Sequence, residues 1–592
     1  MLKKLSDVIA ETLVEEGVGH VFAVSGGASL HLIHSIADNP SINHICNHQE
    51  QASAMAADSY SRVSGNIGVA MATSGPGATN LITGICCSYY DSVPALLITG
   101  NASTKRQTGS TGVRQIGFQE TPIVEVVKPI TKYAVSIQDS NDIVYELKKA
   151  IYIAKSGRPG PVLIDVPDDL QREMIDISKL KKFDAPKEQD LIKASTNSIN
   201  EALKMLKGSK RPVIIAGWGI HLSNTQKEFI HFAESLNIPV AFTWGAPDLM
   251  THEHDLYIGT FGTHGMRHAS FAVQNADVIF SLGSRLDTKS TGSPVSSFAR
   301  DAKKIMLDID INELNKFKNF DLNFDILIHA DLKDFFSYIS NTNLTNYSLK
   351  TKDWILQIKE WEESFNKFDG CENISTTQVN PYVFSKEISK NLPDNSKLLI
   401  DTGCSIAWLM QSLEIPKSVR VFHDCNNTAM GWSIPAAIGA YFASDRKSAV
   451  TVVTGDGSFM MTSYELATIM HHSIPIKIFV INNQGYSMIQ QTQEQWLDSK
   501  YIASSKSGGI SFPNYQKIAD AYDMDYFEMS DNSDVSKIST VIKSIKPTIC
   551  NVKVDDNFRV TPQVVFGKPN EDMGPLMPRD FFNKSMIVEP IE

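Results

Sequence analysis

Two oxygen-bearing side chains that follow neighbouring apolar runs are the strongest chemical signal in this sequence. The run 450–454 ends in Gly455-Asp456-Gly457-Ser458, and the run 476–482 ends in Asn482-Asn483, with Asn483 27 positions after Asp456. If both runs are parallel strands, both ends lie at one edge of a sheet, where ligands bind. A carboxylate and an amide oxygen suit Mg²⁺, and a diphosphate and water can fill its other positions. The glycines let backbone N–H groups approach the phosphate oxygens.

A purely structural interpretation of the same residues is a strand–turn–helix in which Asp456 caps the helix N-terminus. The glycine triplet alone supports little more than that. The Asn pair at this spacing favours the magnesium–diphosphate site, beside a helix that is expected to begin near Thr462.

These residues are positioned by the last of three blocks in which short apolar runs alternate with helix-like stretches. Such alternation predicts an α/β fold with three doubly wound parallel sheets. The expected domains cover residues 1–175, 190–345 and 375–560, followed by an irregular tail, 561–592. Strands are expected at 20–24, 68–73, 95–99 and 162–166; at 212–216, 278–282, 304–309 and 326–329; and at 397–401, 450–454, 476–482 and 548–554. The first and third blocks each place a glycine-rich turn after a mid-domain strand, which indicates duplication of one fold.

Composition restricts the class of protein. A chain of 592 residues has room for several domains, and 42% hydrophobic with 20% charged residues is typical of globular proteins. A net charge of −11 disfavours nucleic-acid binding, which requires basic surface. Seven cysteines without a CxxC pair argue against a disulfide scaffold or zinc ribbon. No stretch reaches the roughly 18 apolar residues of a membrane span. We expect a cytoplasmic protein with neither a nucleic-acid nor a membrane partner.

The Gly-Asp-Gly triplet followed by the Asn pair resembles the signature of thiamine diphosphate (ThDP) enzymes. Further motifs resemble the acetolactate (acetohydroxyacid) synthase-like large-subunit branch, and the resemblance covers nearly the whole chain. They are His48-Gln49-Glu50-Gln51, Ser74-Gly75-Pro76-Gly77-Ala78-Thr79-Asn80, Phe118-Gln119-Glu120-Thr121, Arg158-Pro159-Gly160-Pro161-Val162 and Pro435-Ala436-Ala437-Ile438-Gly439. The resemblance implies a pyrimidine-binding domain, a central domain and a diphosphate-binding domain, in that order.

The resemblance also implies roles for single residues. Glu50 would share a proton with the aminopyrimidine ring of ThDP, so that the cofactor can lose its C2 proton; outside the family, it is an acid that favours a helix N-terminus. Phe118 and Gln119 match a substrate-side pair that the partner subunit supplies, although Phe118 also fits an ordinary core position. The remaining implied contacts are Met430, Gly455, Gly457, Ser458 and Met488 for ThDP, and Asp456, Asn483 and the Gly485 carbonyl for Mg²⁺. Met430 alone is equally a core methionine.

The middle block carries segments like those across which the branch binds FAD. The matching positions are Gly217, Gly219, Gly262, His264, Arg285, Asp308 and Asp331. Related decarboxylases keep this domain without a flavin, so both outcomes stay open. A bound FAD would be structural, because decarboxylation followed by carboligation transfers no net electrons.

The sequence departs from the branch where the acceptor substrate is selected. Asp168 stands where a Lys is common, Asn101 replaces a Gln, and Thr492 replaces a Trp that helps to select a small 2-ketoacid. The segment 101–117 is longer than in typical members and carries three cations, Lys105, Arg106 and Arg114, that could meet phosphates. These changes predict an acceptor that differs from a small ketoacid.

We therefore expect a ThDP- and Mg²⁺-dependent carboligase that decarboxylates a 2-ketoacid donor, above all pyruvate, and transfers the acyl unit to a carbonyl acceptor. The acceptor is another ketoacid, as in acetolactate synthase, or a nucleotide-linked keto sugar of surface polysaccharide synthesis, as in similar flavin-containing relatives. Simple decarboxylation or C–C bond hydrolysis is the alternative enzyme activity, and an inactive regulatory paralogue is the non-enzymatic one. The resemblance also implies a homodimer, or a dimer of dimers, in which Glu50 of one subunit faces Asp456 and Asn483 of another.

Overall fold

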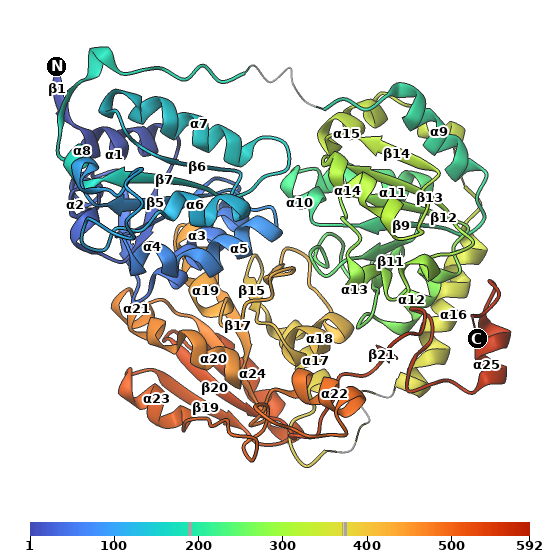
Figure 1. Cartoon of the computed structure of the whole chain (residues 1–592). Helices are drawn as coiled ribbons and strands as arrows, with labels where there is room; N and C mark the ends of the chain where they lie inside the picture. The colour runs from blue at the N-terminus through green and yellow to red at the C-terminus, as the bar shows by residue number, and fades with distance from the viewer. Residues whose placement is uncertain (187–191, 348, 370, 372–373, 375, 592) are drawn as a thin grey trace.

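The computed structural model describes residues 1–592 except 187–191, 348, 370, 372–373, 375 and 592. Three six-stranded parallel sheets, each covered by helices, form three α/β bodies (Figure 1). The N-terminal body, blue to cyan, lies above the orange C-terminal body, and the green central body lies to the right of both. The expected α/β fold class is confirmed.

The first and third sheets have the same topology. The first has the order β3 (Asn43–Cys46), β2 (His20–Ala23), β4 (Gly68–Ala72), β5 (Ala95–Asn101), β7 (Val162–Pro167), β6 (Tyr133–Ser136). The third has the order β16 (Arg420–Phe422), β15 (Lys397–Ile400), β17 (Val450–Gly455), β18 (Lys477–Asn482), β20 (Thr548–Lys553), β19 (Asp525–Met529). Counted within each body, both orders are 2-1-3-4-6-5, which supports duplication of one fold.

The central sheet has a different topology. Its order is β11 (Tyr257–Thr260), β10 (Val240–Phe242), β9 (Pro212–Ala216), β12 (Val278–Leu282), β13 (Lys303–Asp308), β14 (Ile326–His329). This is the order 3-2-1-4-5-6 of dinucleotide-binding folds, in which ligands bind where the strand order reverses, between β9 and β12.

Helices connect the parallel strands. The first body contains α1 (Leu5–Glu15), α2 (Leu30–Asp38), α3 (Glu50–Ser64), α4 (Pro76–Asn80), α5 (Ile82–Tyr90), α6 (Ile123–Val127), α7 (Ile143–Lys155) and α8 (Asp168–Gln171). The central body contains α9 (Thr196–Lys207), α10 (Gly219–Leu222), α11 (Gln226–Leu236), α12 (Arg267–Gln274), α13 (Thr288–Thr291), α14 (Ile311–Asn315), α15 (Leu332–Ser340) and α16 (Lys352–Asp369). The third contains α17 (Pro381–Asn391), α18 (Cys404–Ser412), α19 (Ser433–Ala443), α20 (Asp456–Thr462), α21 (Leu466–His471), α22 (Ser487–Trp496), α23 (Tyr515–Ala521) and α24 (Ile538–Lys543). In the part of the chain that is described, no helix is long and apolar enough to cross a membrane.

The first and third bodies pack directly against each other through α3 and α19. A Cβ on Gly439 would lie 2.0 Å from the carbonyl oxygen of Ala56, so only glycine allows the two helices to approach this closely. The buried guanidinium of Arg62 pairs with Asp58 and with Asp91, each at 2.8 Å. This buried cluster belongs to the first body and binds the third directly. Arg62 Nη1 donates to the carbonyl oxygen of His423 at 3.2 Å, and Trp432 Nε1 donates to the Asp58 carboxylate at 3.1 Å.

The tail returns over the central body. Arg267, which is 1% exposed, donates to the carbonyl oxygens of Met573 (2.8 Å) and Pro575 (3.0 Å). Val564 in β21 (Gln563–Val564) donates its N–H to the carbonyl oxygen of Thr263 at 2.9 Å, and β21 pairs with β22 (Met573–Gly574). The helix α25 (Arg579–Ser585) lies beside α16 (Figure 1). The expectation of an irregular tail is therefore wrong in part, because the tail contains two short strands and a helix and covers this body.

Candidate active site

Glu50 is the first residue of α3 and is 9% exposed. The cap of this helix is the preceding residue, because the Gln49 side chain accepts from the N–H groups of Gln51 (2.5 Å) and Ala52 (3.3 Å). The Glu50 carboxylate is therefore not used for capping. Instead, its Oε2 accepts a hydrogen bond from Asn80 Nδ2 at 2.9 Å. A buried carboxylate with one amide partner still has lone pairs for a ligand.

The glycine turn after β4 brings Glu50 and Gln119 together. A Cβ on Gly77 would lie 3.2 Å from Glu50 Oε1, and one on Gly75 would lie 2.9 Å from the carbonyl oxygen of Gln119. Gly75 has φ +59°, a conformation that favours glycine. The side chain of Phe118, next to Gln119 in the sequence, is 87% exposed. The alternative that Phe118 occupies an ordinary core position is therefore wrong.

The Gly-Asp-Gly segment lies at the carboxyl edge of the third sheet, as predicted. The helix after β17 begins at Asp456 and ends at Thr462, so the expectation that it begins near Thr462 is wrong. The cap position belongs to Gly455, and Asp456 Oδ1 accepts from the N–H of Gly457 at 2.7 Å. Burial raises the pKa of Asp456 to about 7, a cost that a bound cation would offset.

Three oxygens from three residues converge beside this turn. In one of its two orientations, the Asn483 amide directs its oxygen to a point 2.8 Å from the carbonyl oxygen of Gly485 and 3.3 Å from Asp456 Oδ2, while its nitrogen faces Ser487 Oγ. Ligand oxygens at about 2.1 Å from Mg²⁺ in octahedral geometry are about 3.0 Å apart, so this spacing fits a magnesium ion. Without a cation, the amide satisfies both oxygens by turning over and donating to them. These residues therefore fit the predicted metal.

Replacing Asp456 by Ala should weaken ThDP binding in the presence of Mg²⁺ by at least about tenfold to a hundredfold, because the metal that holds the diphosphate loses its only carboxylate ligand. Titration calorimetry with ThDP, with and without Mg²⁺, measures the change. Asp445→Ala is the matched control, since this side chain lies in the same body and is 81% exposed. Unchanged affinity in the Asp456 variant would remove these three oxygens from the metal site.

Met430 lies next to the same turn, since a Cβ on Gly457 would lie 3.1 Å from its Cε and 2.2 Å from Cε1 of Tyr486. Its segment is fixed by Asp401, whose carboxylate accepts from the N–H groups of Gly431 and Ser433, both at 3.0 Å. Burial raises the pKa of Asp401, and Ser458 also donates to it. We did not expect Asp401 or Tyr486. Asp401 directly follows β15. Because ligands bind at the carboxyl ends of parallel strands, the argument that identified Asp456 also applies to Asp401.

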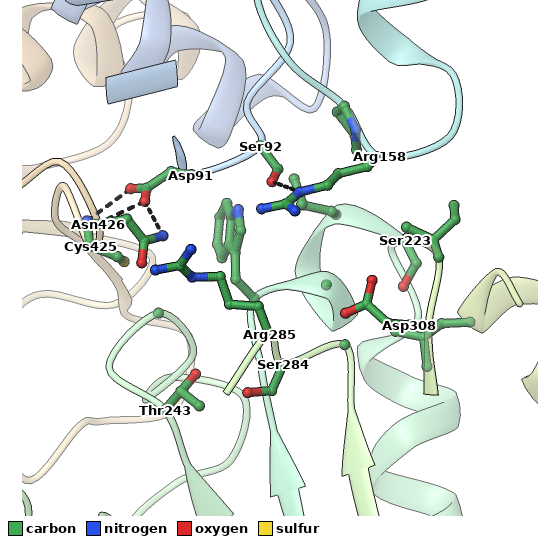
Figure 2. A pocket seen from close by; sticks show the side chains of 18 of the residues that line it. Asp91, Ser92, Arg158, Ser223, Thr243, Ser284, Arg285, Asp308, Cys425 and Asn426 are labelled. Atoms are coloured by element: carbon green, nitrogen blue, oxygen red, sulfur yellow. Dashed lines mark hydrogen bonds between the residues drawn. The ribbon is translucent and has the colours of Figure 1, made fainter. Parts of the chain in front are cut away.

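The central body forms a large cavity with residues from the two other bodies (Figure 2). Its volume is about 670 Å³, within the range of ligand-binding cavities. Five of the seven residues expected to contact FAD line it: Gly219, His264, Arg285, Asp308 and Asp331. Gly217 and Gly262 do not; their Cβ positions would lie 2.3 Å from the carbonyl oxygens of Gly283 and Lys289. These two glycines allow close backbone packing behind the cavity.

Unsatisfied polar groups line this cavity. Among the described residues, Trp218 Nε1 and Arg285 Nε are buried without a hydrogen-bond partner. Burial raises the pKa of Asp308 to about 6. Arg158 reaches across from the first body and pairs with Glu313 (2.7 Å) and Asp310 (3.0 Å), with its Nε bonded to Ser92 (Figure 2). Buried donors without partners fit a polar ligand such as a dinucleotide. Asp331 also caps α15, as its carboxylate accepts from the N–H of Lys333.

A second cavity, of about 220 Å³, lies between α22 and the tail. Met488 and Thr492 line it from the helix, residues 563–567 line it from the tail, and His264 borders both cavities. Neither cavity is lined by Glu50, Asp456 or Asn483.

Asn101 and Asp168, two of the positions at which the sequence differs from the branch, hold the loop 101–117 in place. Asn101 donates to the buried Asp165 at 2.8 Å, and the Asp168 carboxylate accepts from the Ser103 hydroxyl. At the other end, Glu120 accepts from the N–H groups of Ile116 (3.0 Å) and Gly117 (3.2 Å). The three cations Lys105, Arg106 and Arg114 are exposed and form no ion pair with any described residue. Asp168 is thus an anchor of the loop.

Two bodies of one topology, an acid beside a glycine turn on the first and three converging oxygens on the third define a ThDP-dependent enzyme. Family descriptions match in the same order: "Thiamine pyrophosphate enzyme, N-terminal TPP binding domain" at residues 3–125, the "central domain" at 199–339 and the "C-terminal TPP binding domain" at 401–552. The chain belongs to the thiamine pyrophosphate enzyme family, in its acetolactate synthase-like branch.

Relatives of nearly the same length are similar throughout. The acetolactate synthase large subunit of Lactococcus lactis is 33% identical over 96% of this chain and 95% of its own length. That of Pyropia yezoensis is 32% identical over 95% and 94%, and the probable acetolactate synthase large subunit of Methanocaldococcus jannaschii is 32% identical over 93% and 92%. The predicted family is confirmed, and the chain is a ThDP-dependent carboligase that acts on small molecules.

Proposed function

We propose that this enzyme decarboxylates pyruvate and transfers the two-carbon unit to a carbonyl acceptor other than pyruvate. In this reaction C1 of pyruvate leaves as CO₂, a bond forms to the carbonyl carbon of the acceptor, and the acceptor oxygen takes up a proton. No oxidant or reductant is needed. The uncharged cavity that opens beside Thr492, where the branch has a Trp wall, is the observation that favours this acceptor.

ThDP, when bound, supplies the carbon that attacks the ketoacid. Glu50, kept in place by Asn80, exchanges the proton at the pyrimidine, and Gln119 lies on the substrate side of the same turn. Asp456, Asn483 and the Gly485 carbonyl would hold the Mg²⁺ ion, which would bind the diphosphate; their mutual spacing supports this. Gly455, Gly457 and Ser458 supply the turn, and Met430 and Met488 would contact the cofactor.

We also place FAD in the large cavity. The strand order, the unpartnered donors of Trp218 and Arg285, and the carboxylates of Asp308 and Asp331 support a dinucleotide there. The chemistry does not use it, so its role is structural.

The nucleotide-linked keto sugar remains the most specific form of the proposal. Its support is the loop 101–117, which offers phosphates three exposed cations that form no ion pair with the described residues, in a chain of net charge −11. Simple decarboxylation and C–C hydrolysis differ in that no acceptor enters the product, and an inactive paralogue would release no CO₂.

With pyruvate alone, we expect acetolactate to form at least about tenfold more slowly than the product of the best non-ketoacid acceptor. One missing wall contact in a pocket is worth about 1–3 kcal/mol of discrimination, and 1.4 kcal/mol corresponds to tenfold in rate. An acceptor screen that follows CO₂ release and product mass measures both rates. Equal rates would show that acceptor choice is that of an ordinary acetolactate synthase.

Thr492→Trp is the matched variant for this screen. Because it refills the wall, the acetolactate share should rise while CO₂ release per enzyme stays close to that of the wild type. A variant with an unchanged product ratio would exclude Thr492 from acceptor selection.

A further inference from the structure

The cavity between α22 and the tail follows one face of the helix away from the metal ligands. Asn483 and Gly485 lie immediately before α22, and the helix lines the cavity with Met488, Gln491, Thr492, Gln495 and Trp496. These positions recur every three or four residues, which is the spacing of one helix face. From Met488 to Trp496 the helix advances by about 12 Å at 1.5 Å per residue, well beyond the length of a three-carbon ketoacid.

Of the described side chains that line this cavity, none carries a charge at neutral pH. The lining consists of amides, hydroxyls, apolar groups and His264. Burial is the main reason that the pKa of His264 is lowered to about 4, and the positive charge of the nearby Lys289 is the second. Lys289 itself lines the larger cavity, where its Nζ lies 5.1 Å from the centre of the Trp244 ring. A carboxylate placed in the smaller cavity would find no cationic partner among its lining side chains, whereas a neutral ligand needs none.

Several hydrogen-bonding groups of this cavity are free. Gln491 is fully used, since it both donates to and accepts from the backbone of Val560. The side chains of Gln495 and Ser293 and the indole N–H of Trp496 have no hydrogen-bond partner within the described part of the chain. A neutral ligand with several hydroxyl groups could satisfy all three.

Two aromatic rings stand at the far end of the same cavity. Trp496 is 61% exposed and Phe566, in the tail, is 70% exposed. Their ring centroids are 5.6 Å apart with planes at 80°, an edge-to-face contact between the helix and the tail. Exposed aromatic faces next to free amide and hydroxyl groups match a ligand with an apolar face and hydroxylated edges, which is the form of a sugar ring.

We infer that Trp496 and Phe566 form the far wall of the acceptor subsite and select a neutral, hydroxylated carbonyl compound of sugar size over a ketoacid. This inference rests on the proposed carboligase function and adds two specificity residues to it. Any phosphate-bearing part of the acceptor would extend beyond this cavity, so the sugar portion alone suffices as a probe.

The test uses the full-length holoenzyme with saturating pyruvate and a methyl 6-deoxyhexopyranosid-4-ulose, a neutral keto sugar with a free ketone. Trp496→Ala and Phe566→Ala should each raise the KM for the keto sugar at least about tenfold, since each removes a wall of the pocket. The KM for pyruvate as donor should change by less than about twofold. Saturation-transfer NMR of the keto sugar with enzyme lacking pyruvate should lose its signal in the same variants.

Leu497→Ala is the matched control, because Leu497 adjoins Trp496, is 55% exposed and does not line the cavity. Unchanged keto-sugar KM and NMR signal in both aromatic variants would overturn the inference. So would a shift in oligomeric mass by light scattering in Trp496→Ala, since the aromatic pair would then be a subunit contact. If the wild type releases no CO₂ from pyruvate, the carboligase proposal fails, whereas the NMR signal still tests the subsite.

Discussion

Replacing Glu50 by Gln should slow exchange of the C2 proton of bound ThDP by about 10²–10⁴-fold, the usual contribution of general acid–base catalysis. The fold and the binding of Mg²⁺–ThDP should be retained, because Gln is of the same size and its amide oxygen still accepts from Asn80. The amide cannot take and return a proton at the pyrimidine, which is the step that the carboxylate performs.

Hydrogen–deuterium exchange at C2, quenched with acid and followed by NMR, measures this rate directly. Glu125→Gln is a suitable control, since this carboxylate lies in the same body and is 71% exposed. Calorimetry must show that the Glu50 variant still binds ThDP. An exchange rate close to that of the wild type would assign Glu50 to the structure of the turn and exclude it from catalysis.

Most of the strands that the sequence predicted are buried strands in the interior of a sheet, although β14 lies at an edge. All twelve are present within two residues of the expected bounds. Within the three six-stranded sheets, the six missed strands are β3, β6, β10, β11, β16 and β19, and all except β10 lie at a sheet edge. Edge strands are half-solvated and short: β3 reads Asn-His-Ile-Cys and β19 reads Asp-Tyr-Phe-Glu-Met. Their polar side chains conceal the apolar pattern that marks a central strand.

The residues of the candidate site were likewise predictable only in part from the sequence. Asp456 and Asn483 were predicted to meet because strand ends in a parallel sheet share an edge, and the structure places the Asn483 side-chain amide 3.3 Å from Asp456 Oδ2. Contacts between distant segments gave no comparable signal. Nothing local in the sequence indicates that Gln119 would lie against Gly75, or that Phe566 of the tail would meet Trp496 of α22. Such contacts depend on how loops close over the sheets.

Within one chain, Glu50 and the metal ligands lie at opposite ends of α20. Asp456 begins this helix, whereas the corner before Glu50 contacts the residues that follow it: Asn47 and the His48 N–H both bind Glu465 at 2.9 Å. Burial, together with the carboxylates of Glu465 and Glu50, raises the pKa of Tyr464 to about 12.

Exposed apolar side chains flank both halves of the site. Val113, Ile116 and Phe118 lie by the first half, and Met460, Met461 and Ile489 lie by the second, each 41–87% exposed. Their exposure in one chain is what an isologous dimer would bury. We therefore propose a homodimer, alone or as half of a tetramer, in which each site takes Glu50 from one subunit and Asp456 with Asn483 from the other.

Mixing the two inactive variants Glu50→Ala and Asp456→Ala should then restore activity to about a quarter of that of the wild type. Random exchange makes about half of the dimers mixed, and in each of these one of two sites has both residues intact, as two-fold symmetry requires. The second site of a mixed dimer lacks both residues. Each variant alone should stay at background, so the gain upon mixing is large.

Exchange is achieved by brief dissociation and reassembly, and native mass spectrometry of differently tagged chains reports the mixed dimers. CO₂ release from pyruvate in the mixture, against that of each variant treated in the same way, gives the recovered activity. The control is a chain with both substitutions, mixed with the Glu50 variant. Neither chain of that mixture has Glu50, so no site is complete and activity must stay absent. If mixed dimers form and the mixture of single variants remains inactive, each site is built within one chain and the exposed apolar residues serve another contact.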